Sequence, residues 1–280
     1  GQGMGDKDIA FTFKTGKTWF EVPRTMKVII EGELKPPCTA KDLTLACVRQ
    51  LGASGALGQA VEFYGPAVEA LDLAGRITLA SMMTEMGGIV GLIPPSEEVL
   101  AFCRERTGRD DLEAIQADPD AEYTQEIVVD IRDLEPLIAC PPKPDNVKTV
   151  REAAGTKVDS VFIGSCTNGR FEDFAAVAEI VRGKRIAPGM VAAAVPATRE
   201  VYRQMLESGV LQTLFEAGFV VSNPGCGGCA SGHIGMTGEG QVQVSTSNRN
   251  FAGKQGPGDT YLASPVVAAW AALTGELGNW

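Results

Sequence analysis

A regular alternation of short apolar runs and amphipathic stretches fills residues 158–274 and limits the possible fold more than any other property of the sequence. Runs such as VDSVFIGS and GMVAAAVPA have the composition of buried strands, and FEDFAAVAEIVRG and TREVYRQMLESG have the periodicity of helices. Strands that alternate with helices are typical of α/β layers around a largely parallel sheet. In such sheets, sites form where loops leave the carboxyl ends of the strands.

The first half of the chain carries similar signals. MKVIIEGEL reads as a strand, and TAKDLTLACVRQLG reads as a helix with Thr39 as its N-cap and Gly52 as its stop. EYTQEIVVDIRDL alternates as a half-buried strand does. The α/β pattern therefore extends over both halves.

A proline-rich segment, CPPKPDNVKTV at residues 140–150, has the composition of a linker. We therefore expect two α/β domains with mostly parallel sheets. The expected boundaries are a remnant of a first domain at 1–20, an α/β domain at 21–143, and a second α/β domain at 144–280.

Composition excludes several classes of protein. The formal net charge of −10, from 35 acidic and 25 basic residues, argues against general binding to nucleic acid. No apolar run approaches the roughly 20 residues that span a bilayer. An odd number of cysteines, seven, and the lack of a signal-like start argue against a secreted disulfide scaffold. We expect a cytoplasmic protein with reduced thiols and neither a nucleic-acid nor a membrane partner.

Three cysteines stand in Gly-, Ser- and Asn-rich turns after predicted strands: Cys166 in GSCTNG, and Cys226 and Cys229 in PGCGGC. Such turns direct backbone N–H groups toward a common centre, which suits thiolate or sulfide charge. A zinc site would add His233, the only histidine, as a fourth ligand. An iron–sulfur cluster would use the three thiolates and leave one iron open. Spacing alone does not decide between these two, and a redox or disulfide pair of Cys226 and Cys229 is a further alternative.

The other cysteines have no paired spacing, and we expect them to be small buried or idle thiols. They are Cys38, Cys47, Cys103 and Cys140.

Charged residues near these turns suggest an anionic ligand. In STSNRNFAGK, Arg249 is flanked by Asn248 and followed by Lys254, and an arginine so placed can bind a carboxylate through two hydrogen bonds. A solvated surface arginine is the alternative. Glu62 in VEFYGP and Glu85 in TEMGG lie in apolar surroundings, where a carboxylate without a role is costly to bury. Surface or helix-end positions are the alternative for both acids.

Three blocks in this order, VFIGSCTNGR, NPGCGGC and STSNRNFAGK, resemble the aconitase family, above all its isopropylmalate dehydratase and homoaconitase large subunits. VEFYGPAVEAL, GRITLASMMTEMGG and SPVVAAWAALTGEL also fit, so the resemblance covers nearly the whole chain. It implies an aconitase-like α/β core and a [4Fe–4S] hydro-lyase that isomerises a hydroxy di- or tricarboxylic acid by dehydration and rehydration. 3-Isopropylmalate, and hence leucine biosynthesis, is the first expectation for the substrate.

The resemblance also implies roles for individual residues. Cys166, Cys226 and Cys229 would bind three irons, which favours the cluster over zinc and leaves His233 outside the ligand set. Arg249 would have a catalytic role and would bind substrate carboxylates with Lys254, and Asn248 would lie beside them. Glu62 would be a catalytic acid, and Glu85 is a weaker match.

The sequence departs from the family pattern in places. Lys254 stands where the family usually has an arginine, which keeps the charge but loses the forked geometry. The family's N-terminal DSH-type motif has no match here, and its closing swivel domain is a separate small subunit in the isopropylmalate branch. We therefore expect a small-subunit partner and expect the chain alone to be inactive. The alternative is a cluster-binding fragment or assembly module without turnover.

Overall fold

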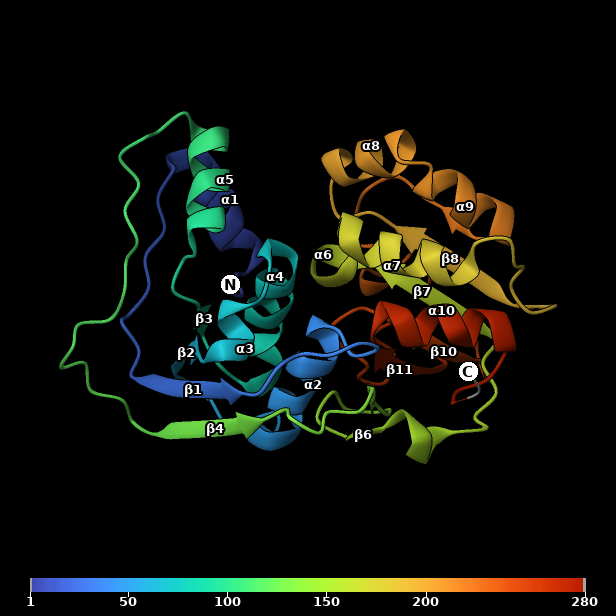
Figure 1. The fold of residues 1–280 in the computed structure, drawn as a ribbon, viewed down its shortest axis with the longest axis horizontal. Coiled ribbons are helices and arrows are strands. Elements are labelled where there is room, and N and C mark those ends of the chain that lie inside the picture. The colour runs from blue at the N-terminus through green and yellow to red at the C-terminus, as the bar shows by residue number, and fades with distance from the viewer. Residues whose placement is uncertain (1, 279–280) are drawn as a thin grey trace. The chain divides into compact units, whose positions relative to one another are not determined.

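The computed structural model describes residues 2–278, which fall into two compact units. Unit 1 comprises the described residues of Gly1–Glu33 together with Leu51–Asp130. Unit 2 comprises Leu34–Gln50 and the described residues of Ile131–Trp280. Each unit contains its own sheet (Figure 1).

Unit 1 is built on a four-stranded parallel sheet in the order β3-β2-β1-β4. Its strands are β1 (Thr25–Glu31), β2 (Ala60–Tyr64), β3 (Val90–Leu92) and β4 (Glu126–Asp130). Burial alternates along β1, where Met26, Val28 and Ile30 are fully buried. This period of two is the pattern of a strand with one face in the core.

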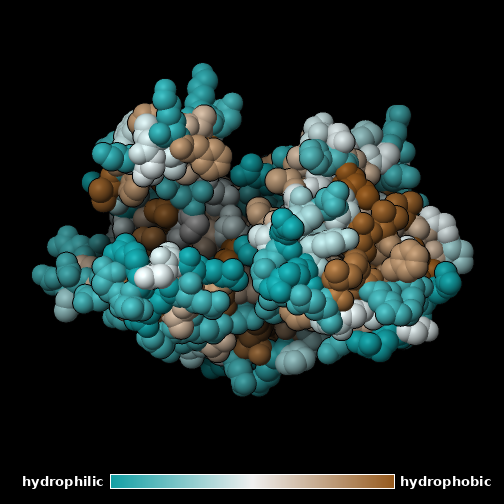
Figure 2. Space-filling view, turned by 90° about the horizontal axis from the view of Figure 1, so that it is seen from above, coloured by the Kyte–Doolittle hydropathy of each residue, from teal (hydrophilic) through white to brown (hydrophobic). Residues whose placement is uncertain are grey.

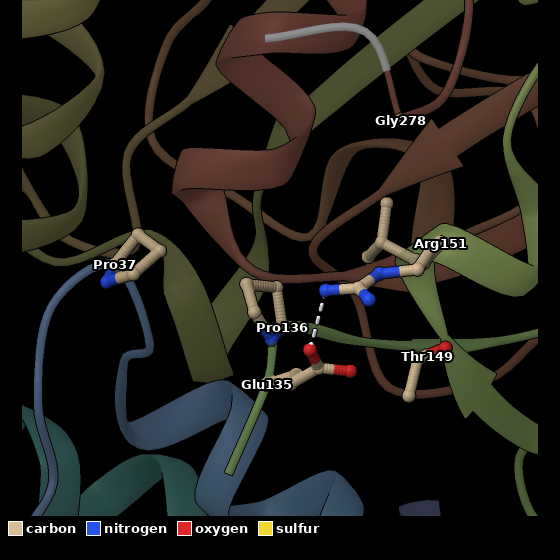
Figure 3. Close-up of a pocket in the computed structure, with 7 residues that line it drawn as sticks. Pro37, Glu135, Pro136, Thr149, Arg151 and Gly278 are labelled. Atoms are coloured by element: carbon tan, nitrogen blue, oxygen red, sulfur yellow. Dashed lines mark hydrogen bonds and ion pairs between the residues drawn. The ribbon is translucent and has the colours of Figure 1, made fainter.

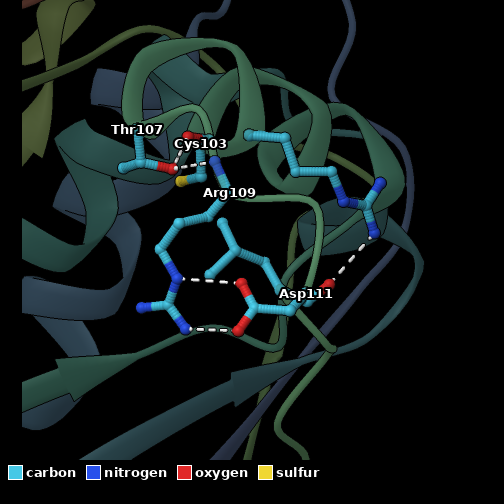
Figure 4. A network of polar contacts seen from close by, with 6 residues as sticks. Cys103, Thr107, Arg109 and Asp111 are labelled. Carbon is cyan, nitrogen blue, oxygen red and sulfur yellow. Dashed lines mark hydrogen bonds and ion pairs between the residues drawn. The ribbon is translucent and has the colours of Figure 1, made fainter.

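The helices of unit 1 are α1 (Asp6–Thr15), α3 (Pro66–Glu69), α4 (Leu73–Ser81), the 3-10 helix η1 (Met82–Met86) and α5 (Glu97–Thr107). Neither α1 nor α5 has a buried residue. Helix α5 begins at the cap Ser96 and ends at Gly108, which has a left-handed backbone. Beyond its end, the Arg109 guanidinium donates two hydrogen bonds to Asp111, of 2.9 and 2.8 Å (Figure 4).

Unit 2 contains a seven-stranded sheet in the order β6-β5-β11-β10-β7-β8-β9. The strands are β5 (Leu137–Ala139), β6 (Val147–Thr149), β7 (Ser160–Gly164), β8 (Val191–Val195), β9 (Val220–Val221), β10 (Val242–Ser245) and β11 (Asp259–Ala263). Neighbouring strands from β11 to β9 are parallel, and β5 is antiparallel to both β11 and β6. The carboxyl ends of β7, β9 and β10 therefore point to the same edge of the sheet.

Helices connect these strands. They are α2 (Ala40–Leu51), the 3-10 helices η2 (Val150–Ala153) and η3 (Gly227–Cys229), α6 (Ser165–Asn168), α7 (Phe171–Val181), α8 (Arg199–Glu207), α9 (Val210–Ala217) and α10 (Pro265–Thr274). One core cluster joins α7, α9 and α10 to the sheet through buried side chains such as Phe174, Leu214 and Val267. Apolar side chains also reach the surface around α8 and α9, where Leu206, Phe215 and Val220 are exposed (Figure 2).

The predicted α/β class with mostly parallel sheets is confirmed. The expected linker function of residues 140–150 is not what the structure shows. Residues 140–146 connect β5 to β6, and these two strands are antiparallel neighbours in one sheet. The division between the units instead follows Glu33, Gln50 and Asp130. Prolines suit a tight connection between strands as well as a linker, so composition alone could not separate the two cases.

No helix in the described part of the chain combines the length and the apolar character that crossing a membrane requires.

Candidate functional site

Cys166 lies in the short helix α6 directly after β7, and its side chain is exposed. The preceding residue, Ser165, has a φ of 79°, the one positive φ recorded for a non-glycine residue between positions 2 and 278. A non-glycine residue in this conformation is strained, and such strain is concentrated at functional sites. The backbone turn at Ser165 thus presents Cys166 at the edge of the sheet.

Cys226 directly precedes η3, which follows β9, and Cys229 is the last residue of η3. The turn is held by backbone hydrogen bonds from Cys229 N to Cys226 O (3.3 Å) and from Ala230 N to Gly227 O (2.9 Å). Gly227 has a φ of 55°, and a Cβ there would lie 2.5 Å from the ring of Phe162. Only glycine therefore allows this turn to lie against β7 so closely.

The two cysteine segments lie together in unit 2, since α6 contacts η3. Burial raises the pKa of the Cys229 thiol, and the charges of Cys166 and Cys226 raise it further, while Lys254 and Arg249 lower it. Three thiols and two cations thus share one electrostatic environment. All three cysteines are free thiols, which is the donor set that an iron–sulfur cluster takes.

Within residues 2–278, no group of three or more His, Cys, Asp and Glu side chains is arranged to hold a metal ion. A single zinc ion needs every ligand atom about 2.0–2.3 Å from one point, whereas a cluster binds each thiolate to a different iron. His233 is exposed, and its backbone N–H bonds to Ala230 O in the loop after η3.

The segment with Arg249 is fixed from several sides. Gln255 Nε2 donates to Arg249 O (2.6 Å), and Ser245 Oγ donates to Gln255 Oε1 (2.9 Å). Lys254 Nζ donates to Cys229 O (2.8 Å), so this loop is joined directly to the cysteine turn. The Arg249 side chain is exposed.

Three buried polar atoms in these loops make no hydrogen bond within the described residues. They are Asn248 Oδ1, Asn250 Oδ1 and Arg170 Nε. Buried polar atoms are nearly always paired, so unpaired ones call for an explanation. A bound group with polar atoms would provide one, which fits the use of these loops as a binding site.

Glu62 lies in unit 1, on β2. Its Oε2 accepts hydrogen bonds from the hydroxyls of Tyr64 (2.7 Å) and Tyr123 (2.8 Å). Lys27 Nζ lies 5.5 and 5.3 Å from the centroids of the same two rings. Burial and the hydrogen bond with its neighbouring phenol are the leading causes that hold the pKa of Tyr64 far above its usual range. The carboxylate of Glu62 is therefore held through one oxygen by two neutral phenols.

The second predicted acid, Glu85, is also in unit 1 and is buried in η1, where Thr84 Oγ1 donates to its Oε1 (3.3 Å). The sequence analysis did not identify Tyr64 and Tyr123 as neighbours of Glu62. Tyr64 is only two residues from Glu62, so its contact could have been considered. Tyr123 is 61 residues from Glu62, and no local pattern reveals that contact.

A separate pocket in unit 2 contains none of the predicted site residues (Figure 3). Across it, Arg151 and Glu135 form an ion pair of 2.6 Å. The pocket is lined by Pro37, Glu135, Pro136, Thr149, Val150, Arg151 and Gly278.

The sequence of this chain is similar to those of known proteins along nearly its whole length. The sequence profile of the aconitase family (aconitate hydratase) matches residues 1–156 and 151–275. A probable methanogen homoaconitase large subunit from Methanosarcina mazei is 46% identical over 276 residues, which are 98% of this chain and 70% of the relative. A 3-isopropylmalate dehydratase large subunit from Methanopyrus kandleri is 44% identical over 277 residues, 98% of this chain and 66% of the relative.

A solved structure, the holo-form of aconitase X from Thermococcus kodakaraensis, aligns with a TM-score of 0.45 at 14% identity, covering 81% of this chain and 49% of that one. The chain spans 70% and 66% of the lengths of the two large subunits named above. It spans 64% of a probable methanogen homoaconitase large subunit from Methanothermobacter thermautotrophicus. The family profile covers nearly all of the chain, and the sequence identity to these relatives extends over 98% of it. This chain belongs to the aconitase family.

Proposed function

We propose that this chain is the cluster-binding part of the large subunit of a [4Fe–4S] hydro-lyase. Its substrate would be a hydroxy di- or tricarboxylic acid, with 3-isopropylmalate as the first candidate. The observation that carries the proposal is the meeting of α6 and η3, which gathers three free cysteines beside Arg249 and Lys254. The names of the relatives, which include isopropylmalate dehydratase and homoaconitase large subunits, support the substrate class.

Cys166, Cys226 and Cys229 would hold the cluster. When bound, the cluster would supply a Lewis-acidic iron with an open position, which polarises the bond between carbon and a hydroxyl oxygen. The protein's own residues bind and orient the substrate. The exposed guanidinium of Arg249 would bind a carboxylate through two hydrogen bonds, and Asn248 would add a polar contact.

Glu62 would serve in proton transfer. Two phenols donate to its Oε2, so the carboxylate is fixed in one orientation. Its Oε1, which accepts no hydrogen bond from the described residues, is the atom at which we place the exchangeable proton. Because the relatives are named as large subunits, the partner would be a small subunit that completes the enzyme.

Anaerobic reconstitution with ferrous iron and sulfide tests the proposal. Wild type should take up both, and C166S, C226S and C229S should each lose most of them. C103S is the matched control, because Cys103 is a free cysteine in unit 1, on α5. Uptake that is equal in wild type and all three site variants would contradict the proposal.

Turnover is measured separately, with a small subunit of the isopropylmalate branch added to the reconstituted chain. The readout is the ultraviolet absorbance of the unsaturated product formed from 3-isopropylmalate. R249K should lower kcat/KM strongly, because lysine keeps the charge but cannot form the paired hydrogen bonds of a guanidinium. Cluster uptake without turnover by the wild-type complex would instead support a cluster-binding module.

A further inference from the structure

Lys41, the second residue of α2, is fully buried in unit 2. Its Nζ donates hydrogen bonds to the backbone carbonyls of Thr246 (3.0 Å) and Ser247 (2.8 Å). These two carbonyls directly precede Asn248 and Arg249 in the chain. The ammonium therefore holds the backbone that carries the proposed carboxylate-binding side chains.

Burial of an ammonium is unfavourable, because the charge loses its hydration. An apolar side chain of similar length would avoid this loss. Buried charges are retained in some proteins because they select one arrangement of the surrounding chain. Lys41 meets this description, since its partners are two consecutive carbonyls at the end of β10.

A buried carboxylate holds the segment that carries Cys166. Burial raises the pKa of Asp173 to about 6, and hydrogen bonds from Arg170 and Asn168 oppose this shift more than the charge of Lys41 does. The carboxylate of Asp173 accepts hydrogen bonds from Arg170 N (2.9 Å) and Asn168 Nδ2 (3.1 Å). Asp173 thereby fixes the turn that follows Cys166.

Thr246 joins the two segments directly. Gly164 N donates to its Oγ1 (2.9 Å), and the same hydroxyl lies 3.2 Å from Gly164 O. Lys41 thus binds the carbonyl of a residue whose side chain is attached to the end of β7. Residues 164–170 and 246–250 are consequently connected by the Thr246 hydroxyl, while Lys41 holds the backbone of the same residue.

We infer that Lys41 is a positioning residue that holds segments 164–170 and 246–250 in a single arrangement and so fixes Arg249 relative to Cys166. Its consequence for catalysis rests on the proposed function. The arrangement itself does not, because every contact that supports it lies within unit 2 of the chain alone.

Hydrogen exchange on the chain without added metal tests the arrangement. K41M keeps an unbranched side chain that is one atom shorter, and it removes the charge and the donors. Amides in 164–170 and 246–250 should exchange at least about tenfold faster, while β1 in unit 1 keeps its protection. K157M is the control for loss of a lysine, because Lys157 is exposed and pairs with Glu276 at the surface of unit 2. Unchanged exchange in both segments, or an equal rise throughout unit 2, would overturn the inference.

If K41M does not fold, K41Q decides the matter. Glutamine removes the charge and keeps a shorter amide donor, so the carbonyls of Thr246 and Ser247 lose the ammonium and both segments should exchange faster. Unchanged protection of both segments would refute the positioning role.

A kinetic experiment on the reconstituted complex tests the consequence. K41M should keep the iron content of wild type but raise the KM for 3-isopropylmalate, with kcat/KM falling roughly 10²-fold, as small misplacements do. If wild type shows no turnover while K41M shows faster exchange in the two segments, the proposed function fails and the positioning role stands. If wild type turns over and K41M matches it in both KM and kcat, the catalytic consequence is refuted.

Discussion

The ammonium of Lys254 donates a hydrogen bond of 2.8 Å to the backbone carbonyl of Cys229. From the sequence, Lys254 was expected to bind a substrate carboxylate. In the structure this lysine joins the loop of Arg249 to the cysteine turn, and its charge also stabilises the Cys229 thiolate. Both effects can coexist with carboxylate binding, but they give Lys254 a function even before a substrate arrives.

Replacement of Lys254 by methionine should make the Cys229 thiol less reactive. Burial already raises the pKa of this thiol and Lys254 lowers it, so removal of the ammonium raises the pKa further. The thiolate is the nucleophile, and each pKa unit lowers its fraction about tenfold at neutral pH. The rate of alkylation of Cys229 by iodoacetamide, followed by peptide mass spectrometry, measures the change. K254R keeps the charge and should react nearly as wild type does; an equal loss in both variants would contradict an electrostatic origin.

Tyr64 and Tyr123 should contribute to the stability of unit 1 in a coupled way. Both phenols donate to the same oxygen of Glu62, and a hydrogen bond to a charged group contributes about 1.5–3 kcal/mol. Y64F and Y123F should each lower the free energy of unfolding by about that amount, and the double variant should differ from their sum by about 0.5 kcal/mol or more. Urea unfolding of the four proteins gives the coupling.

Y202F is the control, because Tyr202 lies on α8 of unit 2, whereas Glu62 belongs to unit 1. Strictly additive effects of Y64F and Y123F would show that the two phenols do not share the carboxylate in solution.

Much of the architecture could be predicted because it depends on local patterns. The helix expected after Thr39 begins at Ala40, and Thr39 Oγ1 accepts a hydrogen bond from Lys41 N (3.2 Å), as its role at the N-terminus required. The short strands β5 and β6 were missed, since three residues are too few to show a period of two. Because these two strands pair antiparallel, the segment expected to be a linker is a connection within one sheet.

The candidate site divides in the same way. Its cysteines and Arg249 stand in turns with distinctive local sequences, so each of them can be recognised from the residues beside it. Lys41 contacts residues 205 and 206 positions away, and nothing in its helix separates it from a surface lysine. Side chains that act through long-range contacts need the coordinates, because their partners are set by how the strands are ordered in the sheet.

Asp42 should make the protein less stable as the pH rises from about 4 to 6. Burial raises its pKa from 3.8 to about 6, although hydrogen bonds from Leu137 and Thr39 oppose the shift. Between these two values the folded state keeps a proton that the unfolded chain has released, so unfolding becomes easier as the pH increases. One pKa unit corresponds to about 1.4 kcal/mol, so the loss through this group is roughly 3 kcal/mol at pH 7.

The comparison of wild type with D42N isolates this contribution. Urea unfolding at intervals between pH 4 and pH 7 should show a smaller decline for D42N, since asparagine does not titrate. Equal declines in the two proteins would mean that Asp42 has an ordinary pKa in the folded state.

His233 should be dispensable for cluster binding. It is exposed, and the proposed ligand set is complete with three thiolates. H233A should therefore bind the same amounts of iron and sulfide per chain as wild type after anaerobic reconstitution, measured by colorimetric analysis of both. C229S, treated in the same way, gives the iron and sulfide content expected when one proposed ligand is removed. A marked loss of iron in H233A would restore the four-ligand alternative.

Two glycines in the cysteine turn should differ in their response to the same substitution. A Cβ at Gly227 would lie 2.5 Å from the Phe162 ring, and its φ of 55° disfavours any side chain, whereas a Cβ at Gly225 meets no atom within 4 Å. Strain and overpacking each cost about 1–3 kcal/mol, so G227A should shift η3 away from β7 and separate Cys226 and Cys229 from Cys166. Iron uptake should then fall steeply in G227A and stay at the wild-type level in G225A, with circular dichroism showing that both variants fold. Full iron uptake by a folded G227A would mean that the close approach of this turn to Phe162 does not determine where the two cysteines lie.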